Sequence, residues 1–514
     1  MDRRIFLKGV AAVPLAGSLD VLAAQASYDP SEQSIGALQG ALAAGKVSSE
    51  GLVGAYLARI ARYDQAGPAF HAVLALNPRA RDDARSLDAE RRAGKLRGPL
   101  HGIPLILKDN VETADPVPTT AGSLALAHSL RGDAPLAARL RAAGAVILGK
   151  ANLSEWANFR STHSQSGWSG VGGQTRNAYD PTRNPSGSSA GSAVAAAASL
   201  CAGAVGTETN GSILSPASLN GLVGLKPTVG VISGTGVVPI SPRQDTAGPM
   251  CRTVADAALL AQVMAERPLG YGSHGNELES FRLQGVRIGA MPVPKSAHPE
   301  TARIYENARA VLTHEGAVLI DLKVPAVFDE ADEPEFEALL FEFKSALNAY
   351  LAGLDPAQVP SRTLEDLIRF NSEHAASELA VFGQEIFEMA QAHGPLTDPA
   401  YLKALATLQR SCDTEGLAPL LNQQDIELLL SPSNGPAERL DTVWGDRHDG
   451  GFSEIASAAA VAGYPSLTVP AGMIRGLPIG ITLVGRRNQD GLLLQVARAY
   501  ERAAGARVAP KLTA

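Results

Sequence analysis

The spacing of apolar residues along the chain predicts an alternation of helices and strands. Residues 49–64 place apolar side chains three and four positions apart, which is typical of an amphipathic helix. The apolar run at 103–107 is too short for a helix and predicts a buried strand that ends at Lys108. A helix capped by Asp133 and a strand at 145–149 are predicted next. This order of elements is typical of an α/β fold.

An alanine-rich segment at 190–198 lies between two turns that are rich in glycine and serine. Its small apolar side chains predict a buried helix. Ser188 and Ser189 precede this segment, and we expect Ser189 to cap its first turn. Gly211 and Ser212 follow it in the chain. Acyl transfer requires a nucleophile and backbone amide donors for an oxyanion, and such turns supply both. We therefore place the candidate active site here.

The segment at 330–415 differs in character from the rest of the chain. Its apolar residues follow a helical period and strand signals are few, so we predict a helical insertion or lid. Strand and helix patterns alternate again from about residue 425. We expect residues 27–514 to form a single domain, an α/β core with this helical flank.

Composition narrows the classes of function. The chain has 514 residues, of which 45% are hydrophobic, enough for a substantial core. The net charge of −7 and the lack of a dense Lys/Arg cluster argue against nucleic-acid binding. Cys201, Cys251, Cys412 and the ten histidines have no metal-ligand spacing, so we expect no metal and no other cofactor. Whether Cys201 and Cys251 form a disulfide stays open at this point.

The first 26 residues have the features of an export signal. Arg3 and Arg4 precede a mildly apolar stretch at 9–24 and a small-residue end at 24–26. This order is typical of a twin-arginine signal cleaved after Ala26, the alternative being a basic N-terminal arm. No other apolar run reaches the length of a membrane span. We expect a soluble protein that folds before export and is periplasmic or secreted.

Residues 187–191 match G-x-S-x-G, the nucleophile elbow of α/β-hydrolases. That elbow requires a hydrophobic strand immediately before it, whereas the preceding residues here are DPTRNPS, with two prolines. It also requires a histidine later in the chain, for which only His448 is a plausible partner. The pattern therefore favours a different mechanism.

Four segments, taken together, resemble the amidase signature family. They are HGIPLILKDN, NPSGSSAGSAVAAAA, TETNGSILSPASLNGLVGLKPT and QDTAGPM, which occur in the family's order with family-like spacing. The family's serine hydrolases use a Ser-Ser-Lys triad, and its fold has a central mixed β-sheet covered by helices on both faces. The resemblance implies that Lys108 is the triad lysine, Ser188 the bridging serine and Ser212 the nucleophile.

The chemistry of such a triad sets conditions on these residues. Ser212 is a poor nucleophile at its free pKa and needs a base within hydrogen-bond reach. Lys108 can act as that base only when it is neutral, so burial must lower its pKa. Ser188 would relay the proton from Ser212 to Lys108. The resemblance also implies a cis peptide bond between Gly187 and Ser188.

The oxyanion would be held by backbone N–H groups of the turn that contains Thr209, Asn210, Gly211 and Ser212. Much of the family has two glycines before the nucleophile, whereas this chain has Asn210 and Gly211. Asparagine adopts unusual backbone angles more readily than most residues. We therefore expect the turn to be kept and the polarity of the pocket to change.

Four further residues have weaker assignments. Trp156 and Phe159 are expected in the pocket wall or in the core. Leu214 stands where an arginine is common in the family, which implies a less charged pocket floor. Asp245, in QDTAG, receives no role from the sequence.

Within the family, the segments LSEWANFRS, ISPRQDTAGPM and RFNSEHAASELAVFGQE resemble the bacterial peptide amidases, which hydrolyse C-terminal amides of peptides. This resemblance implies a peptide or small-molecule amide as substrate, ammonia as a product and an acyl-enzyme as the intermediate. We expect a monomer or homodimer that binds neither nucleic acid nor membrane. The alternatives are a component of an amidotransferase that modifies aminoacyl-tRNA, an aryl- or fatty-acyl-amide hydrolase, and a non-catalytic peptide-binding protein.

Overall fold

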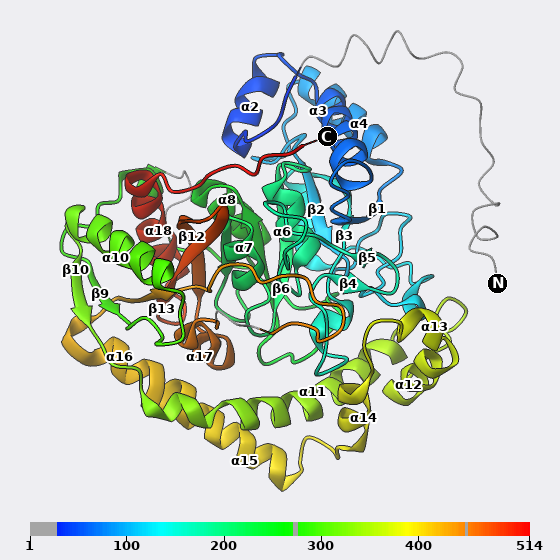
Figure 1. Ribbon diagram of the computed structural model, residues 1–514. Coiled ribbons are helices and arrows are strands. Elements are labelled where there is room, and N and C mark those ends of the chain that lie inside the picture. The colour runs from blue at the N-terminus through cyan, green and yellow to red at the C-terminus, as the bar shows by residue number, and fades with distance from the viewer. Residues whose placement is uncertain (1–27, 271–275, 448–450, 514) are drawn as a thin grey trace, which may run out of the picture.

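The computed structural model describes residues 28–270, 276–447 and 451–513. The expected export signal at 1–26 and His448 lie outside these residues. Within them, the chain folds around one 11-stranded mixed sheet (Figure 1). The strand order is β1-β3-β2-β6-β8-β7-β12-β13-β11-β9-β10. The predicted α/β fold with a central mixed sheet is therefore confirmed.

The strands of this sheet are β1 (Val73–Leu76), β2 (Pro104–Lys108), β3 (Val146–Ala151), β6 (Gly203–Glu208), β7 (Val223–Lys226), β8 (Thr246–Cys251), β9 (Arg287–Ala290), β10 (Val318–Asp321), β11 (Leu428–Pro432), β12 (Ser466–Ile474) and β13 (Leu477–Gly485). β2 pairs in parallel with β3 and β6, β9 pairs in parallel with β10 and β11, and the other neighbours are antiparallel. β2, β3 and β6 are buried along their whole length. Because both faces of these strands are covered, each begins with consecutive small or apolar residues rather than with an alternation, and the polar residues come near the strand ends. A separate ribbon joins β4 (Trp168–Ser169) to β5 (Gly173–Gln174).

The helices are α2 (Ile35–Ala43), α3 (Ser49–Arg59), α4 (Ala80–Arg92), α5 (Pro135–Ala142), α6 (Ala190–Ala197), α7 (Leu214–Leu219), α8 (Val254–Met264), α9 (Asn276–Ser280), α10 (Pro299–His314), α11 (Asp332–Ala352), α12 (Leu364–Glu373), α13 (Ala375–Glu378), α14 (Glu385–Ala392), α15 (Pro399–Leu408), α16 (Ala418–Asn422), α17 (Glu454–Ala462) and α18 (Asp490–Ala504). In the part of the chain that the structure describes, none of them is both long enough and apolar enough to cross a bilayer.

Helices cover both faces of the sheet, as two glycines of β6 demonstrate. A side chain added at Gly203 would contact Leu260 of α8, whereas one added at Gly206 would contact Ser189, just before α6. Strand residues an odd number of positions apart point to opposite faces. α6 and α8 therefore lie on opposite sides of β6, and the alanine-rich α6 is buried along its whole length, as its composition predicts.

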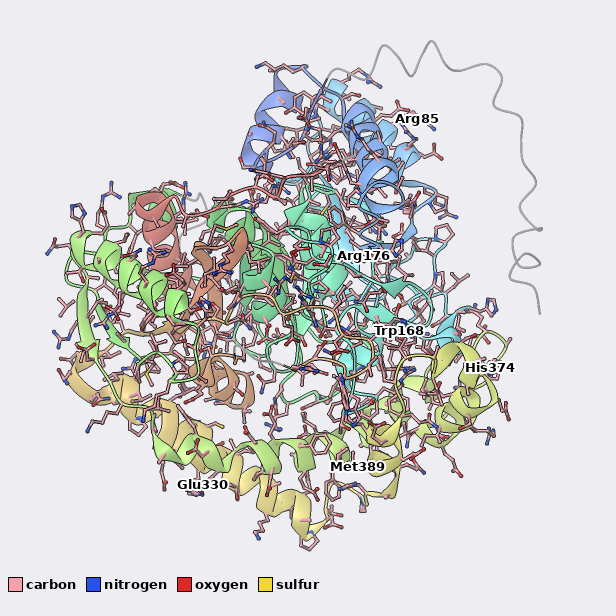
Figure 2. All side chains as sticks on the ribbon, in the orientation of Figure 1. Arg85, Trp168, Arg176, Glu330, His374 and Met389 are labelled. Carbon is pink, nitrogen blue, oxygen red and sulfur yellow. The ribbon has the colours of Figure 1, made fainter. Side chains whose placement is uncertain are left out.

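The segment that follows β10 holds helices α11 to α16, of which α11 to α15 fall within residues 330–415, where the apolar period predicts helices, and α16 follows them. It runs along one side of the molecule, marked by Glu330 and Met389 in Figure 2, while Arg85 of α4 lies on the opposite side. Trp156 packs edge-on against Phe387 of α14, and Phe159 packs edge-on against Phe343 of α11. These two aromatic residues thus belong to an apolar core between the helical segment and the sheet domain.

The start of α5 differs from the sequence-based expectation. Ala134, not Asp133, is the N-cap residue, and Pro135 occupies the first turn, where its fixed φ suits a helix start. Asp133 instead accepts a hydrogen bond from the N–H of Ala114 at 2.7 Å and forms an ion pair with Arg141. Its carboxylate therefore accepts a backbone N–H of a loop rather than one of the first N–H groups of α5.

Candidate active site

Lys108 ends strand β2 with its side chain completely buried. Its Nζ donates hydrogen bonds to Ser188 Oγ at 2.7 Å, to Thr207 Oγ1 at 2.9 Å and to the Thr207 carbonyl at 3.3 Å. Burial lowers the pKa of Lys108 to about 7, although the carboxylates of Asp245 and Glu208 act in the opposite direction. A substantial share of Lys108 is therefore neutral at physiological pH, as a base at this position requires.

Ser188 joins the lysine to the turn before α6. The peptide bond between Gly187 and Ser188 is cis, as the family resemblance implies, and the Ser188 side chain is fully buried. Its carbonyl accepts a hydrogen bond from the N–H of Ser154 at 3.0 Å. Ser188 is therefore held at two points: its carbonyl binds Ser154 and its hydroxyl binds Lys108.

Ser189 has a different task from the one predicted. It is the N-cap residue of α6, but its side chain makes no capping hydrogen bond. Its Oγ donates to the Thr207 carbonyl at 3.0 Å and accepts from the Thr207 N–H at 3.1 Å. Its own N–H donates to the carbonyl of Ser212 at 3.2 Å. Ser189 therefore ties together the end of β6 and the two serine-bearing turns.

Ser212 is half-buried between β6 and α7, next to the turn that holds Ser188. The bond between the Ser189 N–H and the Ser212 carbonyl brings the two turns together. In the described residues, the hydroxyl of Ser212 makes no hydrogen bond to Ser188 or Lys108. The structure thus joins Lys108 and Ser188 directly, and it holds the Ser212 backbone against Ser189, the residue next to Ser188. Catalytic hydrogen bonds often tighten only when substrate is bound.

The turn before Ser212 exposes backbone donors. Gly211 has φ +79°, a left-handed conformation that favours glycine, and its α-carbon faces the ring of Phe452. The buried carboxylate of Glu208 accepts the N–H groups of Ile213 at 2.7 Å and Leu214 at 3.0 Å. Over residues 28–270, 276–447 and 451–513, no group accepts the N–H groups at positions 210 and 212. These two donors are available to an oxyanion.

Two acidic side chains hold this turn from outside. The Thr209 hydroxyl donates to Asp245 at 2.6 Å, and Asp245 also accepts two backbone N–H groups of its own loop. Asn210 Nδ2 donates to both carboxylate oxygens of Glu335 in α11 and to the Ser457 hydroxyl in α17. Burial raises the pKa of Asp245 to about 6 and also raises that of Glu335. The more polar turn predicted from Asn210 is thus accommodated by a partner from the helical segment.

The sequence provides little signal for several of these partners. Thr207 and Glu208 lie within a segment that resembles the family, yet no pattern assigns them a role. Asp245 is noticed in the sequence without a role, and Glu335 is one of several acidic residues near the start of α11. Their contacts depend on how distant segments pack.

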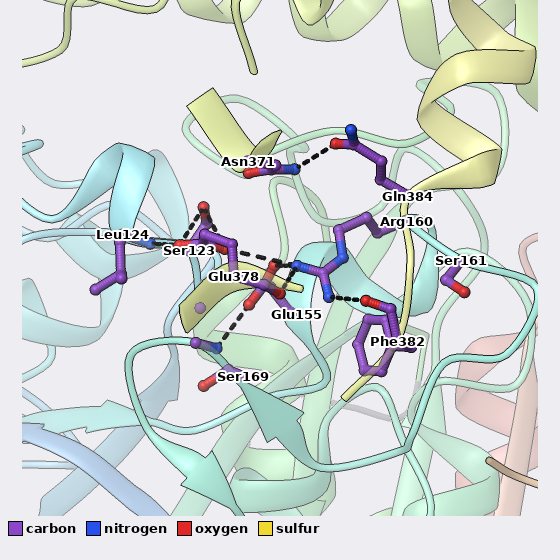
Figure 3. A network of polar contacts seen from close by, with 12 residues as sticks. Ser123, Leu124, Glu155, Arg160, Ser161, Ser169, Asn371, Glu378, Phe382 and Gln384 are labelled. Atoms are coloured by element: carbon purple, nitrogen blue, oxygen red, sulfur yellow. Dashed lines mark hydrogen bonds and ion pairs between the residues drawn. The ribbon is translucent and has the colours of Figure 1, made fainter. Parts of the chain in front are cut away.

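A buried ionic network joins the loop around Glu155 and Arg160 to α13 (Figure 3). The fully buried Arg160 contacts the carboxylates of Glu155 and Glu378 and donates to the carbonyl of Glu378 at 2.6 Å. Burial raises the pKa of Glu155 well above its ordinary value, and the neighbouring Glu378 adds to this. Glu155 follows Ser154, which holds the Ser188 carbonyl. The network therefore connects α13 to the backbone that positions Ser188.

Two alternatives from the sequence can now be judged. The residues immediately before Gly187 form no strand, so the geometry of an α/β-hydrolase elbow is not present. Cys201, Cys251 and Cys412 are all buried free thiols, so Cys201 and Cys251 do not form a disulfide.

Comparisons with known proteins show which family of sequences and structures this chain is similar to. The sequence model of the amidase family matches residues 51–494. A probable amidase of Arabidopsis thaliana is 37% identical, over 97% of this chain and 95% of that protein. The X-ray structure of native peptide amidase from Stenotrophomonas maltophilia is 44% identical, with a TM-score of 0.87, and the match covers 94% of this chain and 99% of that one. A glutamyl-tRNA(Gln) amidotransferase component from Symbiobacterium thermophilum is 33% identical, over 89% of this chain and 94% of that protein.

Proposed function

This chain belongs to the amidase signature family of amide-hydrolysing enzymes, and we propose that it hydrolyses the C-terminal carboxamide of peptides and releases ammonia. We further propose that Ser212 is the nucleophile, Ser188 the proton relay and Lys108 the general base. The hydrogen bond between Lys108 and Ser188 carries this proposal. This bond joins the buried amine of Lys108, whose pKa is about 7, to the Ser188 hydroxyl. The neighbouring turn contains Ser212 and two backbone N–H groups without an acceptor in the described residues.

In the proposed reaction, Ser212 Oγ attacks the carbonyl carbon, and its proton passes through Ser188 to the lone pair of the neutral Lys108 amine. The two N–H bonds of that amine donate to Thr207, and the N–H groups of Asn210 and Ser212 stabilise the oxyanion. The carbon–nitrogen bond then breaks as the proton returns through Ser188 to the departing nitrogen. Water attacks the acyl ester along the same proton path, which restores Ser212 and releases the peptide acid.

The choice of peptide amides rests on similarity. The peptide amidase of S. maltophilia is 44% identical to this chain, whereas the amidotransferase component is 33% identical. An amidotransferase would use glutamine and cytoplasmic partners, and the features of the first 26 residues argue against such a role. Aryl- and fatty-acyl-amide hydrolysis are the competing specificities.

An ammonia-release assay with the purified chain tests this proposal. We expect ammonia release from peptide amides to exceed ammonia release from free glutamine, from primary aryl amides such as benzamide and from primary aliphatic amides. Ser212→Ala should abolish turnover and also stoichiometric labelling by a fluorophosphonate. Ser192→Ala is the matched control, since Ser192 is a fully buried serine of α6 whose hydroxyl donates to the Val205 carbonyl at 2.9 Å and has no proposed chemical role. Labelling that persists in the Ser212→Ala variant would overturn the nucleophile assignment.

The features of residues 1–26 lead us to propose twin-arginine export. Protein recovered from the periplasm should then have Ser27 as its N-terminal residue when its N-terminus is sequenced. Replacement of both Arg3 and Arg4 by lysine should leave the enzyme in the cytoplasm.

A further inference from the structure

A cavity of about 260 Å³ lies between the loop after β9, the end of β11 and the start of α17. Its wall is mainly apolar, with Met291, Val293, Val324, Phe452 and Ile455 among the lining residues. Such a cavity takes an apolar group from water, because burial of apolar surface is favourable.

Two oxygen atoms in this wall lack partners. Thr301 Oγ1 and Asn434 Oδ1 are buried and accept no hydrogen bond from the described residues, and Thr301 is only 1% exposed. A few polar atoms in an otherwise apolar cavity typically fix the orientation of a ligand. The cavity therefore suits an apolar group attached to a hydrogen-bond donor.

The charges at the cavity balance one another. Lys295 and Glu454 are exposed lining residues of opposite sign. They give the cavity no preference for a cation or an anion, so an uncharged side chain fits it best.

The wall of the cavity touches the active site at two points. The ring of Phe452 lies 3.3 Å from where a β-carbon on Gly211 would be, so it borders the oxyanion turn. Asn434 Nδ2 donates at 2.9 Å to the hydroxyl of Ser215, which lies 2.7 Å from the hydroxyl of Ser186. Asn434 therefore stands between the cavity and the residues that flank Ser188 and Ser212.

We infer that this cavity binds the side chain of the residue that carries the scissile amide, with preference for a large apolar side chain. Asn434 Oδ1 accepts the backbone N–H of that same residue. This inference rests on the proposed function and specifies its substrate: peptide amides that end in an uncharged apolar residue.

The test compares N-acetyl-phenylalaninamide, N-acetyl-alaninamide and 3-phenylpropanamide, which lacks the N–H. The unaltered enzyme should prefer the first over the second by about tenfold or more in kcat/KM. Val293→Trp, which fills the cavity, and Val324→Trp, at its partly exposed mouth, should each remove about tenfold from the phenylalanine substrate and little from the alanine substrate. Val318→Trp, on the surface of β10 and outside the cavity lining, is the matched control.

Asn434→Ala tests the polar contact. It should lower kcat/KM for N-acetyl-phenylalaninamide about tenfold more than for 3-phenylpropanamide. A purely structural effect through Ser215 would lower both alike and would overturn the role of Asn434.

Equal changes for the phenylalanine and alanine substrates in both tryptophan variants would overturn the assignment of the cavity. Absence of ammonia release from every peptide amide by the unaltered enzyme would instead overturn the proposed function, together with this inference.

Discussion

The side-chain amide of Asn210 donates hydrogen bonds to both carboxylate oxygens of Glu335, at 3.0 and 2.9 Å. Glu335 also accepts a hydrogen bond from Gln244 Nε2 at 2.7 Å. The buried carboxylate of Glu335 thus binds both Asn210, two positions before Ser212, and Gln244, which precedes Asp245. The helical segment and the oxyanion turn are therefore parts of one hydrogen-bonded unit.

Removal of this carboxylate should impair both stability and turnover. Glu335→Ala removes the carboxylate acceptor of the Asn210 and Gln244 side-chain amides, at a cost of about 1–3 kcal/mol each, and leaves them only Ser457 and the Thr209 carbonyl as partners. We expect a lower Tm and a kcat reduced by more than tenfold with a smaller change in KM, because the backbone donors of the turn lose their position.

Glu335→Gln keeps an acceptor oxygen and should recover much of the lost activity. Glu333→Ala, at an exposed position of the same helix, is the control and should leave kcat and Tm unchanged. Wild-type kcat in Glu335→Ala would contradict the link between α11 and the turn.

The pH dependence of activity should report the ionisation of Lys108. Its pKa of about 7 means that the neutral base accumulates as the pH rises, so kcat/KM should increase through pH 7 and level off above it. Lys108→Met should reduce kcat by about 10²–10⁴-fold. A pH profile of kcat/KM that is flat between pH 6 and 8 would argue against Lys108 as the base.

The same group links stability to pH. Between pH 7 and the ordinary lysine pKa of 10.5, the unfolded chain carries a proton on Lys108 that the folded protein has released. Folding stability should therefore rise with pH across this window, by about 1.4 kcal/mol per unit from this residue alone. Buried Lys226, with a pKa of about 8, adds a similar effect over part of the window. Urea unfolding of wild type and Lys108→Met at several pH values measures how the free energy of unfolding depends on pH, and the difference isolates the contribution of Lys108. The control variant Lys323→Met, at an exposed position, should keep the wild-type dependence on pH.

Substitution at Gly211 should separate backbone strain from catalysis. Gly211 and Gly230 both have left-handed φ, +79° and +84°, so an alanine at either position costs about 1–2 kcal/mol of stability. Only at Gly211 does the new β-carbon meet a neighbour, the ring of Phe452 at 3.3 Å. We expect Gly211→Ala to lower kcat about 10²-fold through displaced oxyanion donors, while Gly230→Ala keeps wild-type kcat. Similar kcat losses in both variants would count against the oxyanion role of this turn.

Substitution of Arg160 should destabilise the protein more than substitution of its partner Glu155. Arg160→Met leaves buried carboxyl groups without their cation and should destabilise the protein by about 3–5 kcal/mol. Glu155→Gln should be milder, since burial raises the pKa of Glu155 and so disfavours its charge, while glutamine keeps the size and one acceptor oxygen of the side chain. Thermal unfolding of both variants measures the difference, and a Glu155→Gln variant as unstable as Arg160→Met would show that Glu155 is ionised.

Much of the fold follows from local patterns. The apolar run before Lys108 predicts a buried strand that ends at this residue, and β2 confirms it. The small residues at 190–198 predict a buried helix, and α6 confirms it. These predictions succeed because the burial of a strand or helix is encoded in the spacing of its own apolar residues. The Asp133 cap fails because Pro135 starts the helix and a nearby loop N–H takes the carboxylate.

The residues of the candidate site could be found from the sequence, whereas several of their contacts could not. The family resemblance of the sequence identifies which lysine and which serines to examine, because their motifs lie within short continuous segments. The tertiary structure alone decided that Glu335 meets Asn210 across 125 residues and that the loop after β9, the end of β11 and the start of α17 enclose a cavity beside Phe452. A polar contact or a cavity depends on the docking of distant segments, and local hydrophobic periodicity contains no information about that docking.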